Sequence, residues 1–325
     1  MQDTATDSAR HRKAVTRLIL ATAAWGISFP LFKMLFAVQQ GHEPSADSFF
    51  LAAHAIGLRA LGAALVISLF KPFLLRGLSR SEWLQGALLG LFGGTGLILQ
   101  ADGLHYTSAS TSAFLTQFYC VLLPAWQCFR RREIPSQRLL LCTALVLAGI
   151  TILSGFDWNQ FRLGRGETET LLSAVVFTVQ IQLLERPSWR NHRMLPVSVV
   201  MFLGFFLCAL PVVLLKKPSW HAVTSIYQSA PEIAIMAAII LICTVYAYTA
   251  MNHWQPFVRA TEAGLIYCLE PVTTALYVLF LPALLAAWTG VPYANESLGT
   301  ATLIGGTLIT LANAILQLPQ KKSLT

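Results

Sequence analysis

A glutamate stands inside an apolar run in the stretch EAGLIYCLEPVTTALYVLF (residues 262–280), and a proline follows it directly. Pro271 has no amide hydrogen, so it would leave the carbonyl of Tyr267 without a helical hydrogen-bond partner. A carboxylate beside a freed carbonyl suits a polar substrate or a proton, which makes Glu270 a candidate for either. The alternative is that Glu270 caps a broken helix or pairs internally, and the sequence leaves both interpretations open.

Two basic residues raise the same question with the opposite charge. Arg59 lies near the middle of an apolar run, where it needs an acid, backbone carbonyls or an anionic group of a substrate as its partner. We favour structural pairing for Arg59, with a substrate contact as the alternative. Lys33 lies nearer the end of the first apolar run, so its long side chain can bring the ammonium group out of the apolar surroundings. It is therefore a weaker candidate for the substrate path.

Further polar and aromatic side chains lie at similar depths in their apolar runs. Each is more often a contact between helices than a contact with a ligand, so packing is the alternative for all of them. Pro30 would free the carbonyl of Gly26, and Pro124 would free that of Cys120, as Pro271 does in its own run. The remaining candidates for the substrate or proton path are Trp25, Ser28, Gln117, Tyr119, Gln180 and Tyr267.

The composition shows which solvent surrounds these residues. Hydrophobic residues make up 55% and charged residues 12% of the 325 residues, whereas an average soluble protein has roughly 25% charged residues. A run of about 20 apolar residues can cross a hydrocarbon core of about 30 Å. We therefore predict an all-α integral membrane protein with ten transmembrane helices. The ten runs lie near residues 15–36, 50–70, 83–101, 108–129, 139–155, 168–186, 195–215, 232–251, 263–287 and 299–318.

The net charge of +8 is interpreted as a signal of topology and not of nucleic-acid binding. When the ten runs cross the membrane alternately, 17 of the 23 Lys and Arg residues fall on the side of the two termini, and 5 fall on the other side. The positive-inside rule then places both termini in the cytoplasm of a multi-pass protein of the inner (plasma) membrane. The N-terminal run superficially resembles a signal peptide, but it continues to about Val38, which favours a retained first helix.

Five runs precede the polar loop GFDWNQFRLGRGE, and five follow it. Because five is odd, the second half must cross the membrane in the reverse sense, as in the inverted-topology repeats of secondary transporters. The segments SAFLTQFYCVLLPAW (112–126) and AGLIYCLEPVTTALY (263–277) are weakly similar, and Gln100 and Gln255 precede them at comparable places. We predict a cytoplasmic tail at 1–14, a first repeat at 15–155, an external loop at 156–166, a second repeat at 167–318 and a cytoplasmic tail at 319–325.

The sequence contains few signals for catalysis. The seven histidines show no HxxxH or HExxH spacing, and the six cysteines show no CxxC spacing. We therefore expect no catalytic residues, no metal site, no cofactor and no enzyme activity. Two alternatives to transport stay open, namely a membrane-embedded enzyme that acts on lipid and a non-transporting membrane sensor or scaffold. Turnover of a lipid by the purified protein would favour the first alternative.

Three stretches resemble the EamA-type permeases of the drug/metabolite transporter superfamily: AAWGISFPLFK, QADGLHYTSASTSAFLTQFYCVLLP and EAGLIYCLEPVTTAL. The resemblance covers roughly residues 17–316. It implies ten helices in an inverted five-plus-five arrangement, a central cavity between the halves, and alternating access. It also identifies Glu270–Pro271 with the family's EP pair and Arg59 with its second-span arginine. The connection at 281–299 departs from the family pattern, because Glu296 is displaced from the usual place of an acidic residue.

The resemblance implies a secondary transporter, and export of a small metabolite such as an amino acid or a related amphipathic compound. In that function Glu270 would be a polar anchor or proton carrier, and Arg59 would be its partner or an anion contact. We expect a small-molecule substrate and membrane lipid as partners, and we expect no nucleic acid. A homodimer is left open by the sequence.

Overall fold

The computed structural model describes residues 2–106, 112, 115–132, 134–154, 164–295, 297 and 299–317, and this part of the chain is helical without any strand. The helices Ala260–Tyr277 and Leu281–Thr289 meet at a bend of 59°, and together they are long and apolar enough for one broken span or a re-entrant loop. The described part of the chain is therefore all-helical, and the protein is a multi-pass integral membrane protein. The count of ten spans stays a prediction. Within the described residues, five helices are long and apolar enough to cross a membrane: Ala9–His42, Ser48–Phe70, Arg80–Tyr106, Met194–Lys216 and Ala230–Phe257.

The first span is broken near its middle. Helix α1 (Gln2–Gly26) and helix α2 (Ser28–His42) meet at Ile27. Pro30 lies in the first turn of α2, where a missing amide hydrogen costs no helical hydrogen bond. The carbonyl of Gly26 accepts a hydrogen bond from Thr274 Oγ1 at 3.1 Å. The backbone group that Pro30 was expected to free is thus bonded by a distant helix.

Four long helices pack against one another at the centre of the molecule. Helix α4 packs against α8 and α9, and α3 packs against α9. Glycines permit the close approach of α4 and α9, because a Cβ atom added to Gly90 would lie 2.8 Å from the Cα atom of Gly204. The bounds of these helices are Ser48–Phe70 for α3, Arg80–Tyr106 for α4, Arg165–Leu184 for α8 and Met194–Lys216 for α9.

One long helix of the second half changes its winding along its length. Helix α11 (Ala230–Ala238) continues through a π-helical segment, η2 (Ile239–Tyr246), into α12 (Ala247–Trp254). Thr244 Oγ1 donates a hydrogen bond to the carbonyl of Ile239, five residues earlier, at 2.9 Å. Short π-helical insertions occur frequently at functional sites, and this one lies beside the cavity described below.

The apolar run that contains Glu270 is also broken. Two residues separate helix α13 (Ala260–Tyr267) from helix α14 (Glu270–Tyr277). Helix α15 (Leu281–Thr289) follows after a further break. Pro271 lies in the first turn of α14. The proline therefore begins a new helix and does not interrupt a continuous one.

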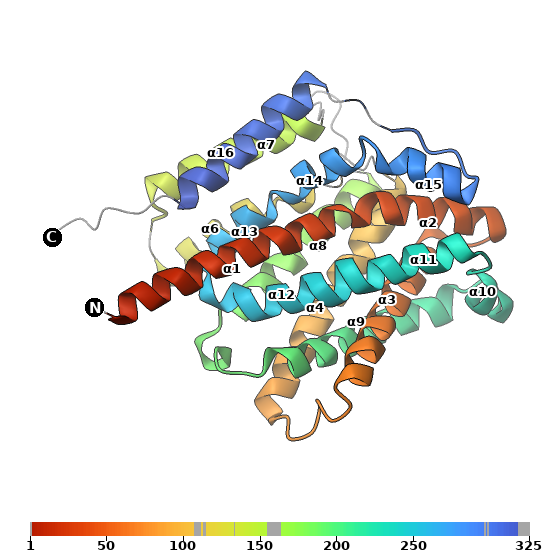
Figure 1. The fold of residues 1–325 in the computed structure, drawn as a ribbon, viewed down its shortest axis with the longest axis horizontal. Helices are drawn as coiled ribbons and strands as arrows, with labels where there is room; N and C mark the ends of the chain where they lie inside the picture. Colours follow the sequence, from red (N-terminus) through yellow and green to blue (C-terminus); the bar gives the residue numbers. More distant parts are fainter. Residues whose placement is uncertain are drawn as a thin grey trace.

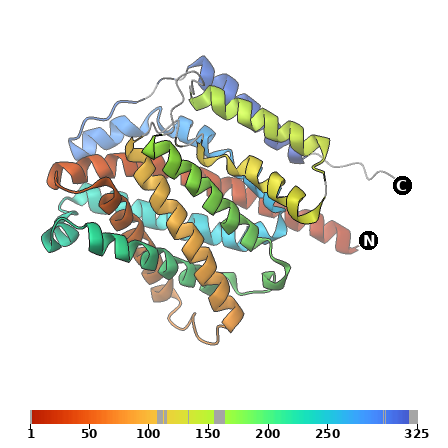
Figure 2. The ribbon, with the colours of Figure 1, turned by 180° about the vertical axis from the view of Figure 1, so that it is seen from behind.

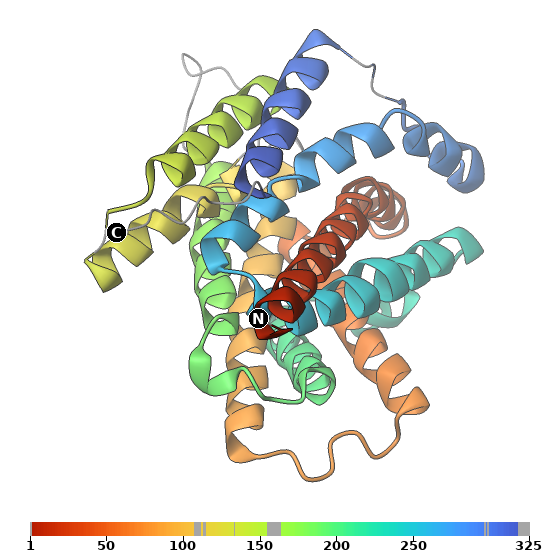
Figure 3. The same cartoon turned by 60° about the vertical axis from the view of Figure 1, so that its left-hand side comes forward.

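The remaining long helices complete the molecule. Helices α7 (Gln137–Ser154) and α16 (Thr300–Gln317) lie side by side along one face, as Figures 1 and 3 show. Helix α1 begins and α16 ends at the same end of the bundle (Figure 1). Which side of the membrane this end faces stays a prediction. The other elements are α6 (Tyr119–Arg131), η1 (Pro187–Trp189), α10 (Trp220–Ser225) and η3 (Gln255–Phe257).

Several of the predicted segments lie outside the described residues. Of the external loop predicted at 156–166, only residues 164–166 are described, and the predicted tail at 319–325 is not described. Glu296, which marked the departure from the family pattern, also lies outside the described residues.

Candidate functional site

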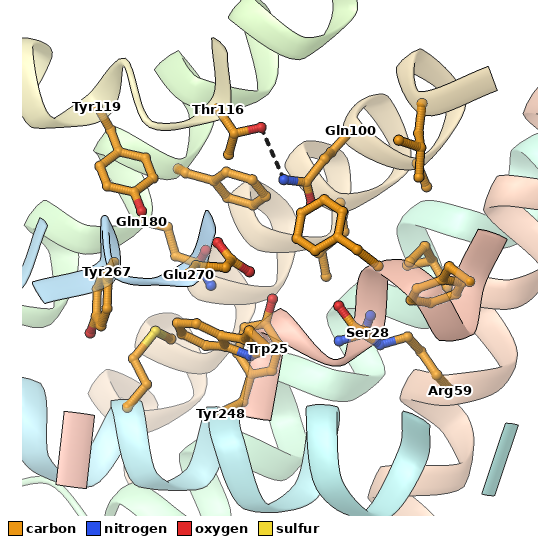
Figure 4. A pocket seen from close by; sticks show the side chains of 18 of the residues that line it. Trp25, Ser28, Arg59, Gln100, Thr116, Tyr119, Gln180, Tyr248, Tyr267 and Glu270 are labelled. Carbon is orange, nitrogen blue, oxygen red and sulfur yellow. Dashed lines mark hydrogen bonds between the residues drawn. The ribbon is translucent and has the colours of Figure 1, made fainter. Parts of the chain in front are cut away.

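A cavity of about 90 Å³ lies where the broken spans meet the central helices. One water molecule needs roughly 10–15 Å³ by such a measure, so the cavity has room for several waters or part of a small ligand. Helices from both predicted halves contribute side chains to its wall, as Figure 4 shows. The polar side chains of the wall, with its tryptophan and tyrosines, are Trp25, Ser28, Arg59, Gln100, Thr116, Tyr119, Gln180, Tyr248, Tyr267 and Glu270.

Glu270 reaches the cavity because it begins α14 directly after the helix break. Its side chain is half-buried. Gln117 Nε2 donates a hydrogen bond to Glu270 Oε2 at 3.3 Å, so residues of the two predicted halves meet here. The other amide atom, Gln117 Oε1, is buried without a hydrogen-bond partner among the described residues. A carboxylate and a neighbouring amide can together bind a cationic or hydrogen-bonding group of a ligand.

Arg59 is 2% exposed and lies on the wall of the same cavity. Its Nε atom donates a hydrogen bond to Thr244 Oγ1 at 2.9 Å, and Nη2 lies 3.5 Å from the carbonyl oxygen of Cys243. Both acceptors belong to the π-helical segment η2. Polar atoms of one segment therefore hold the guanidinium.

Aromatic rings provide the other contacts of Arg59. The guanidinium carbon lies 5.5 Å from the ring centroid of Phe32 and 5.8 Å from that of Tyr248, within the range of cation–π attraction. No carboxylate lies within 4.0 Å of the guanidinium in the described part of the chain. Arg59 and Glu270 thus share a cavity without forming the ion pair that the sequence suggested. The guanidinium is left able to bind an anionic group.

Trp25 lies against two tyrosines of the second half. Its ring centroid is 5.2 Å from that of Tyr248 and 5.4 Å from that of Tyr267. The indole Nε1 atom is buried without a hydrogen-bond partner among the described residues. The hydroxyl of Tyr267 donates to Gln255 Oε1 at 2.8 Å, and Gln255 Nε2 donates to the carbonyl of Ile181 at 2.8 Å. This chain of hydrogen bonds fixes Tyr267 while its ring faces the cavity.

Most of the remaining candidates from the sequence also face the cavity. Ser28, Tyr119 and Gln180 lie on its wall. Pro124 lies inside α6 and is not a residue of the wall. Lys33 is different, because its side chain is exposed and its ammonium group lies 5.8 Å from the ring centroid of Tyr293. The structure thus places Lys33 outside the cavity wall.

Three of the wall residues named above, Gln100, Thr116 and Tyr248, were not among the site candidates from the sequence. Gln100 Nε2 donates a hydrogen bond to Thr116 Oγ1 at 3.1 Å. Gln100 precedes its repeat segment at a place comparable to that of Gln255. That correspondence is the sequence signal that could have identified Gln100 as a wall residue. Tyr248 packs against both Trp25 and Arg59. No sequence pattern separates Tyr248 from a tyrosine that packs against lipid.

Comparison with known proteins adds to this geometry. Residues 12–155 match the EamA-like transporter family. These residues form an EamA-type transporter domain. The resemblance to EamA-type permeases expected from the sequence is thereby confirmed over these residues.

Two further similarities extend beyond the matched residues. An uncharacterized transporter from Archaeoglobus fulgidus is 23% identical over 261 residues, which cover 80% of this chain and 75% of that protein. A protein of known crystal structure has a similar fold, with a TM-score of 0.63 and 17% identity. That similarity covers 94% of this chain and 98% of the other. At this identity it shows the shared fold alone.

Proposed function

We propose that this EamA-type permease is a secondary transporter that exports a small metabolite, such as an amino acid or a related amphipathic compound, by alternating access. The observation that carries the proposal is the cavity shared by Arg59 and Glu270, two side chains of opposite charge that do not neutralise each other by direct contact. A charged group inside a membrane span is costly and therefore marks a functional position by default.

The chemistry of the cavity wall agrees with an amphipathic substrate. The guanidinium of Arg59 suits a carboxylate or another planar anion. The carboxylate of Glu270 suits an ammonium group or a transported proton. The rings of Trp25, Tyr248 and Tyr267 offer faces to the apolar part of the same molecule.

Alternating access is the part of the proposal that concerns the two halves. We propose ten transmembrane helices as a five-plus-five inverted repeat, with repeats at 15–155 and 167–318 and with both termini in the cytoplasm of the inner membrane. Two hydrogen-bonded pairs at comparable places support this: Gln100 with Thr116, and Gln255 with Tyr267. Each pair joins a glutamine to the segment that the sequence aligns between the halves.

We also propose that the chain is not an enzyme. The match to a transporter family and the name of the archaeal relative support transport instead. Turnover of a lipid substrate by the purified protein would contradict this part of the proposal.

The experiment that tests transport has two steps. A thermal-stability screen of the purified protein with amino acids, nucleosides, sugars and cationic drugs identifies a ligand, and counterflow of that ligand is then measured in proteoliposomes. We expect Arg59→Gln to slow counterflow at least tenfold. The control Lys33→Gln removes a positive charge outside the cavity and should leave counterflow unchanged. Equal effects of the two substitutions would contradict the proposed site.

A further inference from the structure

A second cavity, of about 670 Å³, lies between α6 and α8, and it shares no wall residue with the central cavity. The two helices lie side by side when the molecule is seen from behind (Figure 2). Most of the wall is apolar. The apolar residues are Leu122, Ala125, Trp126 and Phe129 from α6 and Val175, Val179 and Leu183 from α8.

The charged residues of this cavity gather at one end. The one hydroxyl on the described apolar wall, that of Thr178, donates a hydrogen bond to the carbonyl of Ala174 at 2.8 Å. Ser112, which precedes α6, lies 3.5 Å from Thr170 near the start of α8, so the two segments begin at the same end. Arg130 near the end of α6 and Arg186 just after α8 therefore lie together at the opposite end. Both arginines are exposed and line the cavity.

Neither of these arginines has an acidic partner in the described part of the chain. No carboxylate lies within 4.0 Å of Arg130 or Arg186 in the described residues. The guanidinium carbon of Arg186 lies 4.7 Å from the ring centroid of Trp189, which holds the side chain without neutralising it. Two positive charges thus stand at the mouth of an apolar groove.

A buried amide lies between the apolar wall and the arginines. Gln182 Nε2 is buried without a hydrogen-bond partner among the described residues, and Gln182 lines the cavity. Arg186 follows Gln182 by four residues, just past the end of α8. About one helical turn therefore separates the two side chains, and the amide lies about 6 Å further into the groove. Along α8 the order of groups is therefore apolar at Val175 and Val179, then a hydrogen-bond donor, then a positive charge.

We propose that this groove binds one anionic phospholipid at the membrane surface. An acyl chain lies along the apolar wall, an ester carbonyl accepts a hydrogen bond from Gln182, and the phosphate lies between Arg130 and Arg186. Charge complementarity selects an anionic headgroup, and the apolar length of the groove selects a lipid over free phosphate. Basic pockets between transmembrane helices bind such headgroups by the same physical means.

The test measures retained lipid by native mass spectrometry of the purified protein. Phosphatidylglycerol or phosphatidylcholine is added at matched concentration. We expect preferential retention of one phosphatidylglycerol. Each arginine near an anionic headgroup is worth about 1 kcal/mol, or about fivefold in affinity, so Arg130→Gln with Arg186→Gln should weaken retention by about 25-fold. The control pair Arg76→Gln with Arg80→Gln removes the same charge elsewhere and should leave retention unchanged.

A second variant keeps the test decisive if the double substitution fails to fold. Ala125→Trp places an indole in the apolar part of the groove and leaves both arginines intact, and it should abolish retention of phosphatidylglycerol. Equal retention of the two lipids, or equal effects of the two double variants, would overturn the proposal. Displacement of the lipid by inorganic phosphate would assign the site to free phosphate instead. A lipid-free dimer that dissociates in Ala125→Trp would assign the groove to a second copy of the chain.

Discussion

Arg165 Nη2 lies 2.5 Å from Asp102 Oδ2, although the carboxylate of Asp102 is completely buried. The pair joins α4 to the start of α8, and thus one predicted half to the other. Ser48 Oγ donates to the second oxygen of Asp102 at 2.6 Å, and Arg165 also contacts Glu169 and Tyr106, each at 2.8 Å. Leu104, two residues from Asp102, lines the central cavity. The network therefore ties three helices together at one end of that cavity.

Loss of one partner from this pair should be costly. Arg165→Gln leaves the buried carboxylate of Asp102 with the hydrogen bond from Ser48 but without its cation. Because the Arg165 side chain is half-exposed, we expect a loss of about 1–3 kcal/mol, the cost of a buried polar group that loses a partner. The double substitution Arg165→Gln with Asp102→Asn removes both charges and should recover part of that stability. Thermal unfolding in detergent compares the stability of the single variant with that of the double variant.

An exposed ion pair provides the control for this comparison of variants. Lys216 Nζ lies 3.2 Å from Asp47 Oδ2, and both side chains are substantially exposed. Lys216→Gln should cost about 1 kcal/mol or less. If Arg165→Gln were no more destabilising than Lys216→Gln, the network would have no structural role.

The hydrogen bond between Arg59 and Thr244 positions the guanidinium on the cavity wall. Thr244→Val removes the acceptor and leaves a buried charged donor unsatisfied, which costs about 1–3 kcal/mol or more. Ligand affinity should fall together with stability. Thr244→Ser keeps the hydroxyl and should retain both properties. Ligand titration and thermal unfolding separate the two variants, and equal behaviour of Val and Ser would show that the hydroxyl does not position Arg59.

The place of Glu270 at the cavity predicts a specific effect on coupling. If Glu270 carries transported protons, Glu270→Gln should abolish flux driven by a proton gradient, because an amide does not titrate. Counterflow of the ligand, which needs no net proton movement, should continue. The control Glu43→Gln changes a carboxylate in the segment between α2 and α3 and should leave coupling intact. Proton-driven flux that is unchanged in Glu270→Gln would exclude a proton-carrying role.

The contact between the two broken spans predicts a glycine effect. A Cβ atom added to Gly26 would lie 2.3 Å from Thr273 Oγ1 and 3.1 Å from the amide nitrogen of Thr274. Gly26→Ala should therefore destabilise the protein by about 1–3 kcal/mol through overpacking. Gly41→Ala is the matched control, because a Cβ atom there meets nothing within 4 Å. Thermal unfolding compares the two, and a neutral Gly26→Ala would mean that α1 and α14 separate readily.

The sequence by itself showed that this protein lies in a membrane, and it marked Pro30 and Pro271 as two places where a helix would be interrupted. Apolar runs and scarce charge identify a membrane protein, because hydropathy is a local property of the chain. The helix breaks beside Pro30 and Pro271 are local for the same reason, since proline acts on its own turn. The family resemblance likewise depends on short contiguous motifs.

Only the tertiary structure decided which polar groups meet. Arg59 is held by Thr244, which is 185 residues away, and not by Glu270. Lys33 faces away from the cavity that Trp25 and Ser28 line, although all three lie in one apolar run. Such contacts depend on the rotation of each helix and on the faces that pack together. Hydropathy along the chain carries no information about a partner 100 or more residues away, so the sequence identified the depth of these side chains but not their neighbours.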